Sequence, residues 1–332
     1  MSGGTGDAGE EIPPPEDEHA FGERIERHRR ELRVHCYRML GSFEEAEDLV
    51  QETFLRAWRA RETFAGRSTF RAWLYRIATN ACLDAAARRA PVLQPLPPGD
   101  ASSPAEIPWL QPFPDRFLQG DPEEEPDAVV IAKETIELAF LAAIQHLPPR
   151  QRAVLILRDV LGQPAAEAAE TLGMSVAGLK SALQRARATM RDHLPERRAE
   201  WGPSGDPTRE EREVLDRYMR ASEGADLDAL AELLAEDARQ TMPPEPAVFL
   251  GRDAVLAMWA PVLTGPDAWG DWRHLPTRAN RQPAVAGYCR RRGQPSYEAV
   301  NLDVLRIEGG RVAEITTFGP HLFPAFGLPP RL

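Results

Sequence analysis

Hydrophobic residues in the first part of the chain recur with the spacing of amphipathic helices. Between residues 21 and 90 they predict three helices, of which the second follows Ser42, a residue whose hydroxyl can cap a helix. Glu45 stands three positions further on, where a capping-box partner is expected. The helical period returns over residues 128–198, after a proline-rich interval at 91–127 that predicts an extended linker. We therefore predict two all-α domains joined by this linker.

The pattern changes from residue 208 onward. Two helices are predicted over residues 209–222 and 226–235, and apolar and β-branched residues then recur as they do in strands. The predicted strands cover residues 248–250, 284–288, 297–307 and 312–318. Two adjacent glycines predict a hairpin turn between the last two strands, at residues 308–311. Residues 208–332 are thus predicted to form an α+β domain that is distinct from the helical part.

Charge divides the chain along the same lines. The formal net charge of −11 argues, as an average, against binding to nucleic acid. The average conceals two basic blocks, since residues 21–90 carry a net charge of +4 and residues 128–198 carry +3. The linker carries −7, and residues 1–20 hold six acidic side chains and no basic one, which predicts a disordered acidic tail. Nucleic acid therefore stays among the expected partners.

Composition excludes several classes of protein. No apolar run approaches the roughly 20 residues that cross a bilayer, and the N-terminus has neither the basic nor the apolar region of a secretion signal. Cys36, Cys82 and Cys289 lie far apart without a CxxC pair, so neither a disulfide framework nor a zinc site built on thiol pairs is expected. We expect a cytoplasmic protein without a cofactor, a bound metal or a membrane contact.

The segment that begins at Leu147 has the layout of a helix-turn-helix: a helix, a short helix after Gln163, a turn at Gly173 and a longer helix. In the longer helix the apolar residues expected to face inward are Val176, Leu179, Leu183, Ala186 and Met190. The opposite side carries the polar and basic residues Lys180, Ser181, Gln184, Arg185 and Arg187. Such residues suit a DNA groove, and an ordinary solvated helix face is the alternative interpretation.

A second candidate surface lies within residues 44–89. From Phe54 to Arg89 there are eight arginines against two acidic residues, and the run FRAWLYRIATN at 70–80 places aromatic residues between them. Basic side chains attract phosphates, and aromatic side chains stack on unpaired bases. Core packing is expected for Phe70, Trp73 and Leu74, whereas the better surface candidates are Tyr75, Arg76 and Asn80. The polar side of the preceding helix is either solvated or a docking face.

These runs carry a resemblance to a known family. DLVQETFLRAW at residues 48–58 and FRAWLYRIATN at 70–80 resemble region 2 of the extracytoplasmic-function sigma factors, which belong to the sigma-70 family. The segment from LPPRQR at 147–152 to QRAR at 184–187 resembles their region 4. The resemblance covers residues 21–194. It implies a non-enzymatic subunit that binds bacterial core RNA polymerase and directs promoter-specific initiation.

The resemblance also implies roles for individual residues. The helix of residues 48–58 would dock on the clamp helices of the largest polymerase subunit through Asp48, Gln51, Glu52, Leu55 and Arg56. The −10 promoter element would be read and melted by Arg67, Arg71, Tyr75, Arg76, Asn80 and Arg88. The −35 element would be bound in its major groove by Ser175, Lys180, Ser181, Gln184, Arg185 and Arg187. Region 4 would also meet the polymerase flap, and the acidic linker would thread the transcript channel.

The chain departs from the family in two respects. Ala182 stands where members often have an arginine, which leaves the −35 sequence open. The linker is also long for the family.

Residues 208–332 resemble a SnoaL-like, polyketide-cyclase-type domain of the cone-shaped nuclear-transport-factor superfamily. The resemblance rests on the diproline at 243–244, GRDAV at 251–255, ANRQPA at 279–284 and the glycine hairpin at 309–311. Together with WLQPFPD at 109–115, it is similar to a sigma-factor subgroup that carries such a fused domain. A pocket in this cone would be lined by Met242, Trp259, Trp272, Tyr288 and His321, unless these residues are simply core.

We expect the fused domain to pack against the sigma part or the linker and to modulate affinity for polymerase, because covalent fusion gives a high effective concentration. Two alternatives remain open. One is a helix-turn-helix regulator that binds DNA without polymerase. The other is a bifunctional protein whose C-terminal domain binds a small molecule or is a cyclase-type enzyme. An enzyme needs an acid–base pair, and spacing alone pairs none of the candidates His274, His321, Asp271 and Asp303.

Overall fold

The computed structural model describes residues 18–64, 69–88, 104, 107–118, 136–193 and 207–332. These residues belong to two units, each with its own internal packing. The first unit draws on residues 18–88 and 147–190, and the second draws on 104–118, 136–146 and 191–332. The second unit therefore contains part of the predicted linker as well as the C-terminal domain. No helix within the described ranges is long and apolar enough to cross a membrane.

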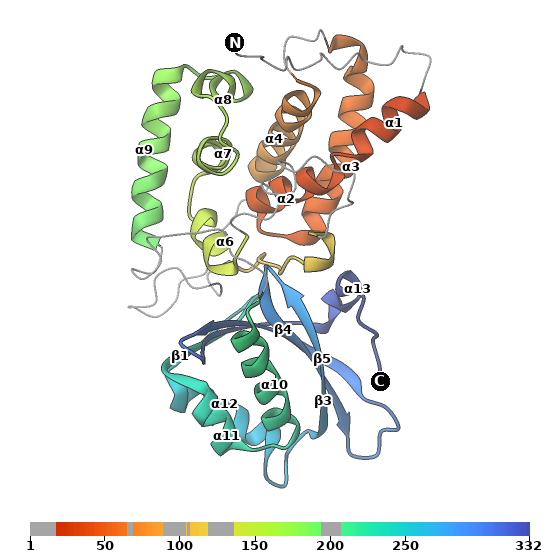
Figure 1. The fold of residues 1–332 in the computed structure, drawn as a ribbon, viewed down its shortest axis with the longest axis vertical. Coiled ribbons are helices and arrows are strands. Elements are labelled where there is room, and N and C mark those ends of the chain that lie inside the picture. The colour runs from red at the N-terminus through yellow and green to blue at the C-terminus, as the bar shows by residue number, and fades with distance from the viewer. Residues whose placement is uncertain (1–17, 65–68, 89–103, 105–106, 119–135, 194–206) are drawn as a thin grey trace, which may run out of the picture. The chain divides into compact units, whose positions relative to one another are not determined.

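The first unit begins with four α-helices, α1 (Glu18–Glu26), α2 (Arg29–Leu40), α3 (Phe43–Ala60) and α4 (Phe70–Arg88), shown in Figure 1. A 3₁₀ turn, η1 (Arg61–Thr63), follows α3. Ser42 caps α3 as predicted, because its hydroxyl accepts a hydrogen bond from the Glu45 N–H at 3.3 Å. Gly41 ends α2 in the left-handed conformation with a φ of 74°, which glycine adopts without a Cβ clash. Helices α2, α3 and α4 pack on one another.

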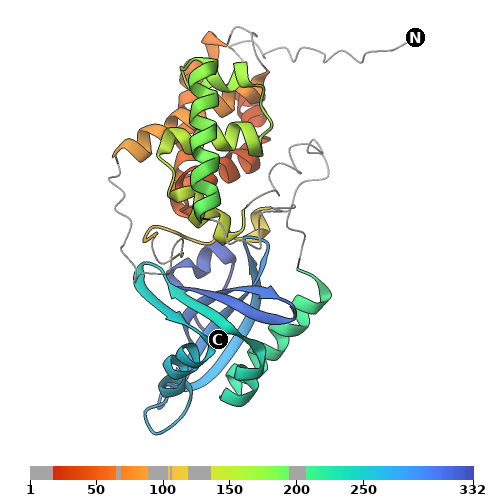
Figure 2. The ribbon, with the colours of Figure 1, turned by 90° about the vertical axis from the view of Figure 1, so that its left-hand side faces the viewer.

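The remainder of the first unit consists of α7 (Pro149–Leu155), the π-helical turn η4 (Ile156–Val160), α8 (Ala165–Thr171) and α9 (Val176–His193). The turns that separate them use Gly162 and Gly173, whose φ angles of 63° and 59° favour glycine. The predicted helix-turn-helix layout is confirmed by these bounds. Helix α7 packs on α2 and α4, and Figure 2 shows α9 along the surface that faces the viewer.

The second unit is an α+β domain. Its helices are α10 (Arg209–Glu223), α11 (Leu227–Leu233) and α12 (Arg252–Leu263). Its strands are β1 (Leu234–Met242), β2 (Glu245–Leu250), β3 (Gly270–Ala279), β4 (Gln282–Arg291), β5 (Glu298–Glu308) and β6 (Arg311–Phe318). They form one mixed sheet in the order β2-β1-β6-β5-β4-β3, in which β1 and β6 are parallel and the other pairs antiparallel. The predicted α+β class is confirmed.

Two strands were not predicted from the sequence. Strand β1 follows α11 directly, and the helix predicted over residues 226–235 extends into the first two residues of this strand. Strand β3 contains Pro276 and three charged residues, which are uncommon in the interior of a sheet. It lies at the edge of the sheet, where proline and charge are tolerated because only one side is hydrogen-bonded.

The central strands of the sheet, β4, β5 and β6, are buried on both faces over part of their length. Helices α10, α11 and α12 lie against one face in Figures 1 and 2, and the apolar core beneath them includes Tyr218, Trp259 and Leu305. Side chains alternate between the faces of a strand, so Leu302 and Val304 point to the opposite face, where they are also buried. The short elements η3 (Asp115–Phe117), α6 (Leu138–Gln145), η6 (Pro320–Leu322) and α13 (Phe323–Phe326) complete this unit.

Candidate functional site

Helix α3 has one buried face and one exposed face. Its buried side is apolar, and Asp48, Gln51 and Leu55 lie on the other side, with Leu55 52% exposed. Arg56 is held on this face by Glu52 at 2.8 Å and by Asp84 of α4 at 2.7 Å. An exposed leucine thus lies on the same face as charged side chains that are held by ion pairs. All five residues assigned to polymerase binding are therefore at least partly accessible.

Two of the −10 candidates, Arg71 and Tyr75, bind a buried carboxylate instead of both facing solvent. Tyr75 is buried, and its hydroxyl donates to the Glu31 carboxylate at 3.1 Å. Arg71 donates to the same oxygen at 2.7 Å, and His28 contacts the other oxygen at 2.6 Å. The prediction that Tyr75 is a surface residue is wrong, because its place on the inner side of α4 lets it satisfy a buried carboxylate. Phe70, Trp73 and Leu74 are buried as expected.

The Glu31 carboxylate is the centre of this group. Burial raises its pKa, but the hydrogen bonds from His28 and Arg71 and the charges of both outweigh that effect and hold its pKa below the ordinary value. Burial, together with the Glu31 charge, raises the pKa of Tyr75 well above its ordinary value. Both groups thus keep the protonation states that stabilise the fold at neutral pH. Sequence patterning did not indicate Glu31, since it stands in a run of charged residues.

A buried histidine is expected to make the first unit sensitive to acid. His35 is fully buried, with Nε2 2.9 Å from the Thr79 hydroxyl, and burial and the Arg38 charge lower its pKa from 6.5 to about 3. The unfolded chain binds a proton near pH 6.5 and the folded chain does not, so stability falls as pH drops below 6.5. We expect a loss of about 2 kcal/mol between pH 7.5 and 5.0. Urea unfolding followed by fluorescence at both pH values measures it.

The His35→Gln variant is the control for this prediction. Its amide can still contact Thr79 but does not titrate, so part of the pH dependence should disappear. An unchanged pH dependence in this variant would assign the acid sensitivity to other groups.

The remaining −10 candidates differ in their surroundings. Asn80 and Arg88 are exposed on α4, whereas Arg67 lies outside the described residues. Arg76 pairs with Glu170 of α8 at 3.4 Å, beside a cavity of about 150 Å³ between these two helices. Helix α8 belongs to the segment that resembles region 4. Within the first unit, it therefore faces the part of α4 that carries Arg76. DNA at Arg76 would have to replace this ion pair.

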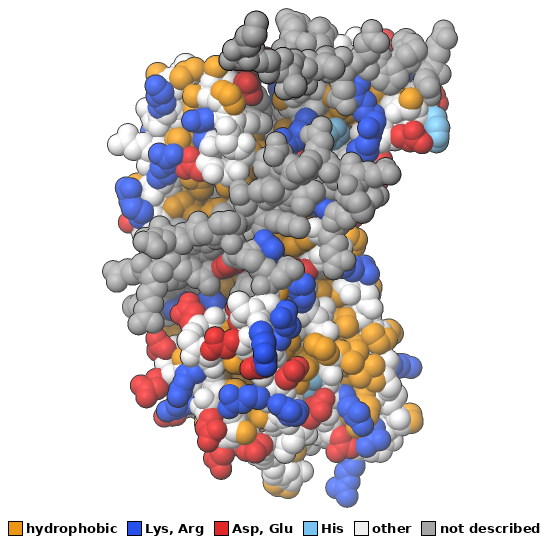
Figure 3. Space-filling model, in the orientation of Figure 1, with side chains coloured by type: hydrophobic (Ala, Val, Ile, Leu, Met, Phe, Trp, Pro, Cys, Tyr) orange, Lys and Arg blue, Asp and Glu red, His pale blue; other side chains and the backbone are white. Residues whose placement is uncertain are grey.

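Helix α9 presents the predicted DNA face. Leu179, Leu183, Ala186 and Met190 are buried as expected, but Val176 is 40% exposed and its predicted inward position is wrong. Val176 is the first residue of this helix. Side chains exposed on the opposite side are Lys180, Ser181, Gln184, Arg185 and Arg187. Figure 3 shows Lys and Arg side chains along the edge where α9 lies.

Two of the −35 candidates are already engaged. The Ser175 hydroxyl accepts a hydrogen bond from the Gly178 N–H at 3.1 Å, which makes it a cap of α9. Arg187 forms a two-bond contact with Asp159 at 2.8 and 2.7 Å. The residues most available to DNA are therefore Lys180, Ser181, Gln184 and Arg185.

Arg152 is a buried contact that sequence patterning missed. It is 5% exposed and donates from α7 to the Met39 carbonyl at the end of α2 and to the Leu147 carbonyl at 3.0 Å. The last carbonyls of a helix have no partner within the helix, so a guanidinium satisfies them well. Arg152 thereby fastens α7 to the α2 end. The available signal in the sequence was the position of Arg152 directly before the apolar run AVLIL at 153–157.

Residues 107–118, which we call the linker segment, are bound by the turn between β3 and β4. This linker-binding turn consists of Asn280 and Arg281, with φ angles of 54° and 61°. The Phe113 N–H donates to Asn280 Oδ1 at 2.7 Å, and the Asn280 N–H donates to the Phe113 carbonyl at 2.9 Å. Asn280 Nδ2 donates to the Ile136 carbonyl. One fully buried side chain therefore joins two separate parts of the chain to the sheet.

Asp115 makes the second contact of the linker segment. Its Oδ1 accepts the Arg281 N–H at 2.9 Å, and its Oδ2 lies 3.3 Å from Arg278 Nε. The carboxylate is 6% exposed. The linker segment also buries Ile107, Leu110 and Phe113. The motifs WLQPFPD and NRQPA, noted separately in the sequence, thus meet in space.

Among the described residues, those predicted to line a C-terminal pocket do not gather at one site. Trp259 lies in the core under the helices, while Tyr288 contacts Phe323 at 5.3 Å on the opposite face of the sheet. Trp272 stacks between Trp269 and His274. Met242 is partly buried on β1 and His321 is exposed. The prediction that these residues converge is wrong, because they come from a helix, a 3₁₀ turn and three different strands and pack in separate places.

A polar cluster occupies the interior of the second unit instead. Asp303 accepts hydrogen bonds from Tyr218 at 3.1 Å and from Thr317 at 2.7 Å, and Gln240 donates to Thr317 at 2.9 Å. Burial raises the pKa of Asp303, although its hydrogen bonds oppose that shift. Burial also raises the pKa of Tyr218 well above its ordinary value. Asp303 and Thr317 are thus hydrogen-bonded within the cluster, whereas the buried Gln240 Oε1 has no hydrogen-bond partner among the described residues.

Comparison with known proteins identifies the family. The model described as Sigma-70 region 2 matches residues 24–91, that of Sigma-70 region 4 matches 137–190, and that of the SnoaL-like domain matches 215–315. The ECF RNA polymerase sigma factor SigG of Mycobacterium tuberculosis is 41% identical over 332 residues, which span 96% of this chain and 87% of SigG. The chain belongs to the ECF sigma factors.

Other ECF sigma factors extend this assignment. SigJ of Mycobacterium tuberculosis is 32% identical over 214 residues, 63% of this chain and 60% of SigJ. The crystal structure of SigJ aligns with a TM-score of 0.58 and 23% identity, covering 93% of this chain and 99% of that one. SigJ therefore shares the fold, including an α+β C-terminal part. In this ECF sigma factor the region 2 match covers α2, α3 and α4, and the region 4 match ends within α9.

Proposed function

We propose that this ECF sigma factor binds core RNA polymerase through the exposed face of α3 and directs it to promoters through α4 and α9. The observation that carries the proposal is the pairing of an exposed, apolar-centred face on α3 with a basic, exposed helix-turn-helix face on α9. The −10 contacts are assigned to Arg76, Asn80 and Arg88, with Arg67 retained from the sequence. The −35 contacts are assigned to Lys180, Ser181, Gln184 and Arg185.

The C-terminal domain is proposed to regulate this activity by binding the linker segment. A segment whose backbone is bonded to Asn280 and whose Asp115 is bonded to Arg281 cannot also follow an extended path through polymerase. Binding to core would then require the linker segment to leave the linker-binding turn, which costs free energy. The fused domain is in this way a brake on polymerase binding.

Run-off transcription with core polymerase tests the docking assignment. The Leu55→Arg variant should lower the run-off yield about tenfold, because a charge replaces the apolar centre of the α3 face. Promoters are taken from a selected DNA pool, and the sigma factor is kept below saturation.

Leu250→Arg is the matched control. Leu250 lies on β2 and is 52% exposed, the same fraction as Leu55. Its replacement should leave the yield unchanged, since it is not assigned to any contact with polymerase. Equal yields from both variants would remove α3 from the proposed interface.

A cyclase-type enzyme in the C-terminal domain is the less supported function. The expected pocket residues point to different faces, and Asp303 is enclosed by Tyr218 and Thr317. An acid–base residue has to reach the substrate proton. We therefore propose a binding and regulatory role for the domain rather than catalysis.

A further inference from the structure

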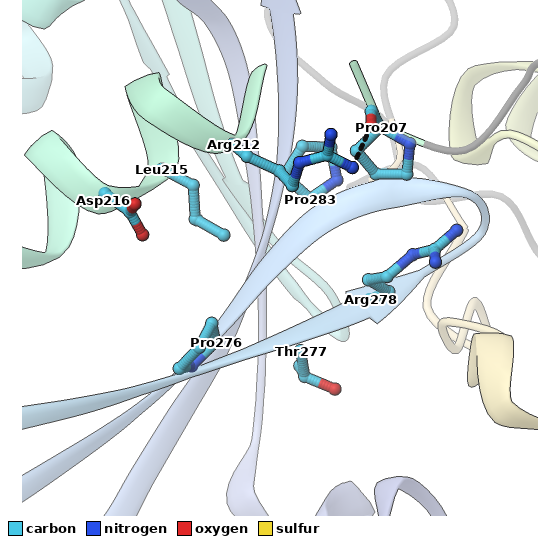
Figure 4. Close-up of a pocket in the computed structure, with 8 residues that line it drawn as sticks. All are labelled: Pro207, Arg212, Leu215, Asp216, Pro276, Thr277, Arg278 and Pro283. Atoms are coloured by element: carbon cyan, nitrogen blue, oxygen red, sulfur yellow. Dashed lines mark hydrogen bonds between the residues drawn. The ribbon is translucent and has the colours of Figure 1, made fainter. Parts of the chain in front are cut away.

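The second unit contains a cavity between α10 and the β3–β4 hairpin, with a volume of about 380 Å³. Figure 4 shows its lining. The volume falls within the range of roughly 300–1,000 Å³ that is usual for small-molecule sites. Its apolar walls come from three prolines and Leu215. Prolines hold their shape when a ligand enters, so these walls are already formed.

The charges in the cavity are arranged unevenly. Arg212 of α10 and Arg278 of β3 lie toward the hairpin end in Figure 4, while Asp216 lies beside Leu215 toward the other end. Arg212 donates to the Pro207 carbonyl at 2.9 Å, a contact that fixes its direction and leaves further guanidinium donors. Two guanidinium groups at one end of an apolar cavity suit a single carboxylate.

We propose that this cavity binds a small molecule with one carboxylate and an apolar body, the carboxylate lying between Arg212 and Arg278. None of the predicted pocket residues lines this cavity, which is distinct from the core around Asp303. A cationic ligand would meet both arginines, and a phosphate would leave the apolar walls unused.

The position of Arg278 links the cavity to the linker segment. Arg278 lines the cavity, and its Nε lies 3.3 Å from Asp115 Oδ2. A ligand carboxylate would compete with Asp115 for this guanidinium. A bound ligand should therefore weaken the binding of the linker segment to its turn. The bound linker segment should weaken the affinity for the ligand by the same factor. This link rests on the proposed regulation by the C-terminal domain, whereas the binding site itself does not.

Calorimetric titration of the full chain tests the site with phenylacetate, 1-naphthoate and decanoate. We expect saturable binding of at least one acid, about tenfold tighter than binding of its neutral amide. The Arg212→Gln variant should weaken that binding about tenfold. Arg209→Gln is the control, since Arg209 is on the same helix, pairs with Glu213 and does not line the cavity.

Three results would overturn the site: no saturable binding of any of the acids at millimolar concentration, equal affinity for acid and amide, or unchanged affinity in Arg212→Gln. The Asp115→Asn variant tests the link, because its neutral amide competes less well for Arg278. It should bind the acid more tightly than the native chain by about threefold or more. Unchanged affinity in this variant alongside normal ligand binding overturns the link and leaves the site in place.

Hydrogen exchange of the linker segment separates the site from the regulation. Adding the bound acid should speed exchange within residues 107–118, and the run-off yield should rise with it. Faster exchange without a change in yield contradicts the proposed brake and supports the site and its link.

Discussion

Replacing Asn280 with glycine is expected to lower the free energy of unfolding of the second unit by about 3 kcal/mol and to release the linker segment. The side chain is fully buried and makes two hydrogen bonds to backbone groups, at Phe113 and Ile136. Its loss leaves a buried N–H and a buried carbonyl without these partners, and each such group costs roughly 1–3 kcal/mol. Glycine is chosen because it accepts the φ of 54° without strain.

Urea unfolding and hydrogen exchange measure the two parts of this prediction. Hydrogen exchange of residues 107–118 should become faster in this variant, because the linker segment is released from the linker-binding turn. In run-off transcription the variant should increase the yield about threefold at limiting core polymerase, because the linker no longer has to be pulled from the turn.

Arg281→Gly is the matched control for this variant. It changes the neighbouring turn residue, whose φ is 61°, and keeps the backbone N–H that Asp115 accepts. Its unfolding free energy should stay equal or rise slightly, since glycine removes the left-handed strain of arginine. If Asn280→Gly leaves both exchange and yield at native values, the linker contact does not regulate the protein.

The Glu31→Gln variant is expected to destabilise the first unit by about 3 kcal/mol. The carboxylate is 3% exposed and accepts from Arg71, Tyr75 and His28. A neutral amide leaves the Arg71 guanidinium without its counter-charge in a site that is only 30% exposed. Chemical denaturation at pH 7.5 measures the loss, and Glu62→Gln, at an exposed acid on η1, should cost less than about 0.5 kcal/mol.

The pH dependence of the same group gives an independent check. The pKa of Glu31 is lower in the folded chain than its ordinary value of 4.5. Its contribution to stability is therefore complete above pH 4.5 and is lost as pH falls through the lower, folded value. The native chain should lose more stability than Glu31→Gln over this interval. A double-mutant cycle with Arg71→Gln should show a coupling of about 2 kcal/mol, and additive effects would mean that the pair does not interact.

Much of the fold could be predicted from local patterns. Helix starts at Ser42 and Pro149, the glycine turn at 309–310 and the change of period near residue 208 all depend on neighbours within a few residues. Local chemistry determines such features, because caps, turns and amphipathic faces are satisfied within one element. The exposed faces of α3 and α9 are also local features that are determined within one element. They were predicted correctly, apart from Val176 at the start of α9.

The features that could not be predicted from the sequence involve residues that are far apart in the chain. Tyr75 is buried because it meets Glu31, 44 positions away, and its own neighbours gave no sign of that carboxylate. The pocket residues Trp259 and Tyr288 were grouped by type, but Trp259 lies on α12 in the core beneath the helices, whereas Tyr288 on β4 packs against Phe323. Edge strand β3 was missed because its exposed residues carry no apolar period.

The sequence by itself determined the two helical regions, their basic charge, the α+β C-terminal domain and the family to which they belong. Only the tertiary structure decided where the linker segment goes. Phe113 and Asn280 are 167 positions apart, and each motif alone looks like a loop. Their backbone and amide groups become partners only when β3 and β4 form the turn that holds Asn280 in the left-handed conformation. Long-range hydrogen bonds of this kind have no local pattern, which is why the contact proposed to regulate this sigma factor was visible only in the folded chain.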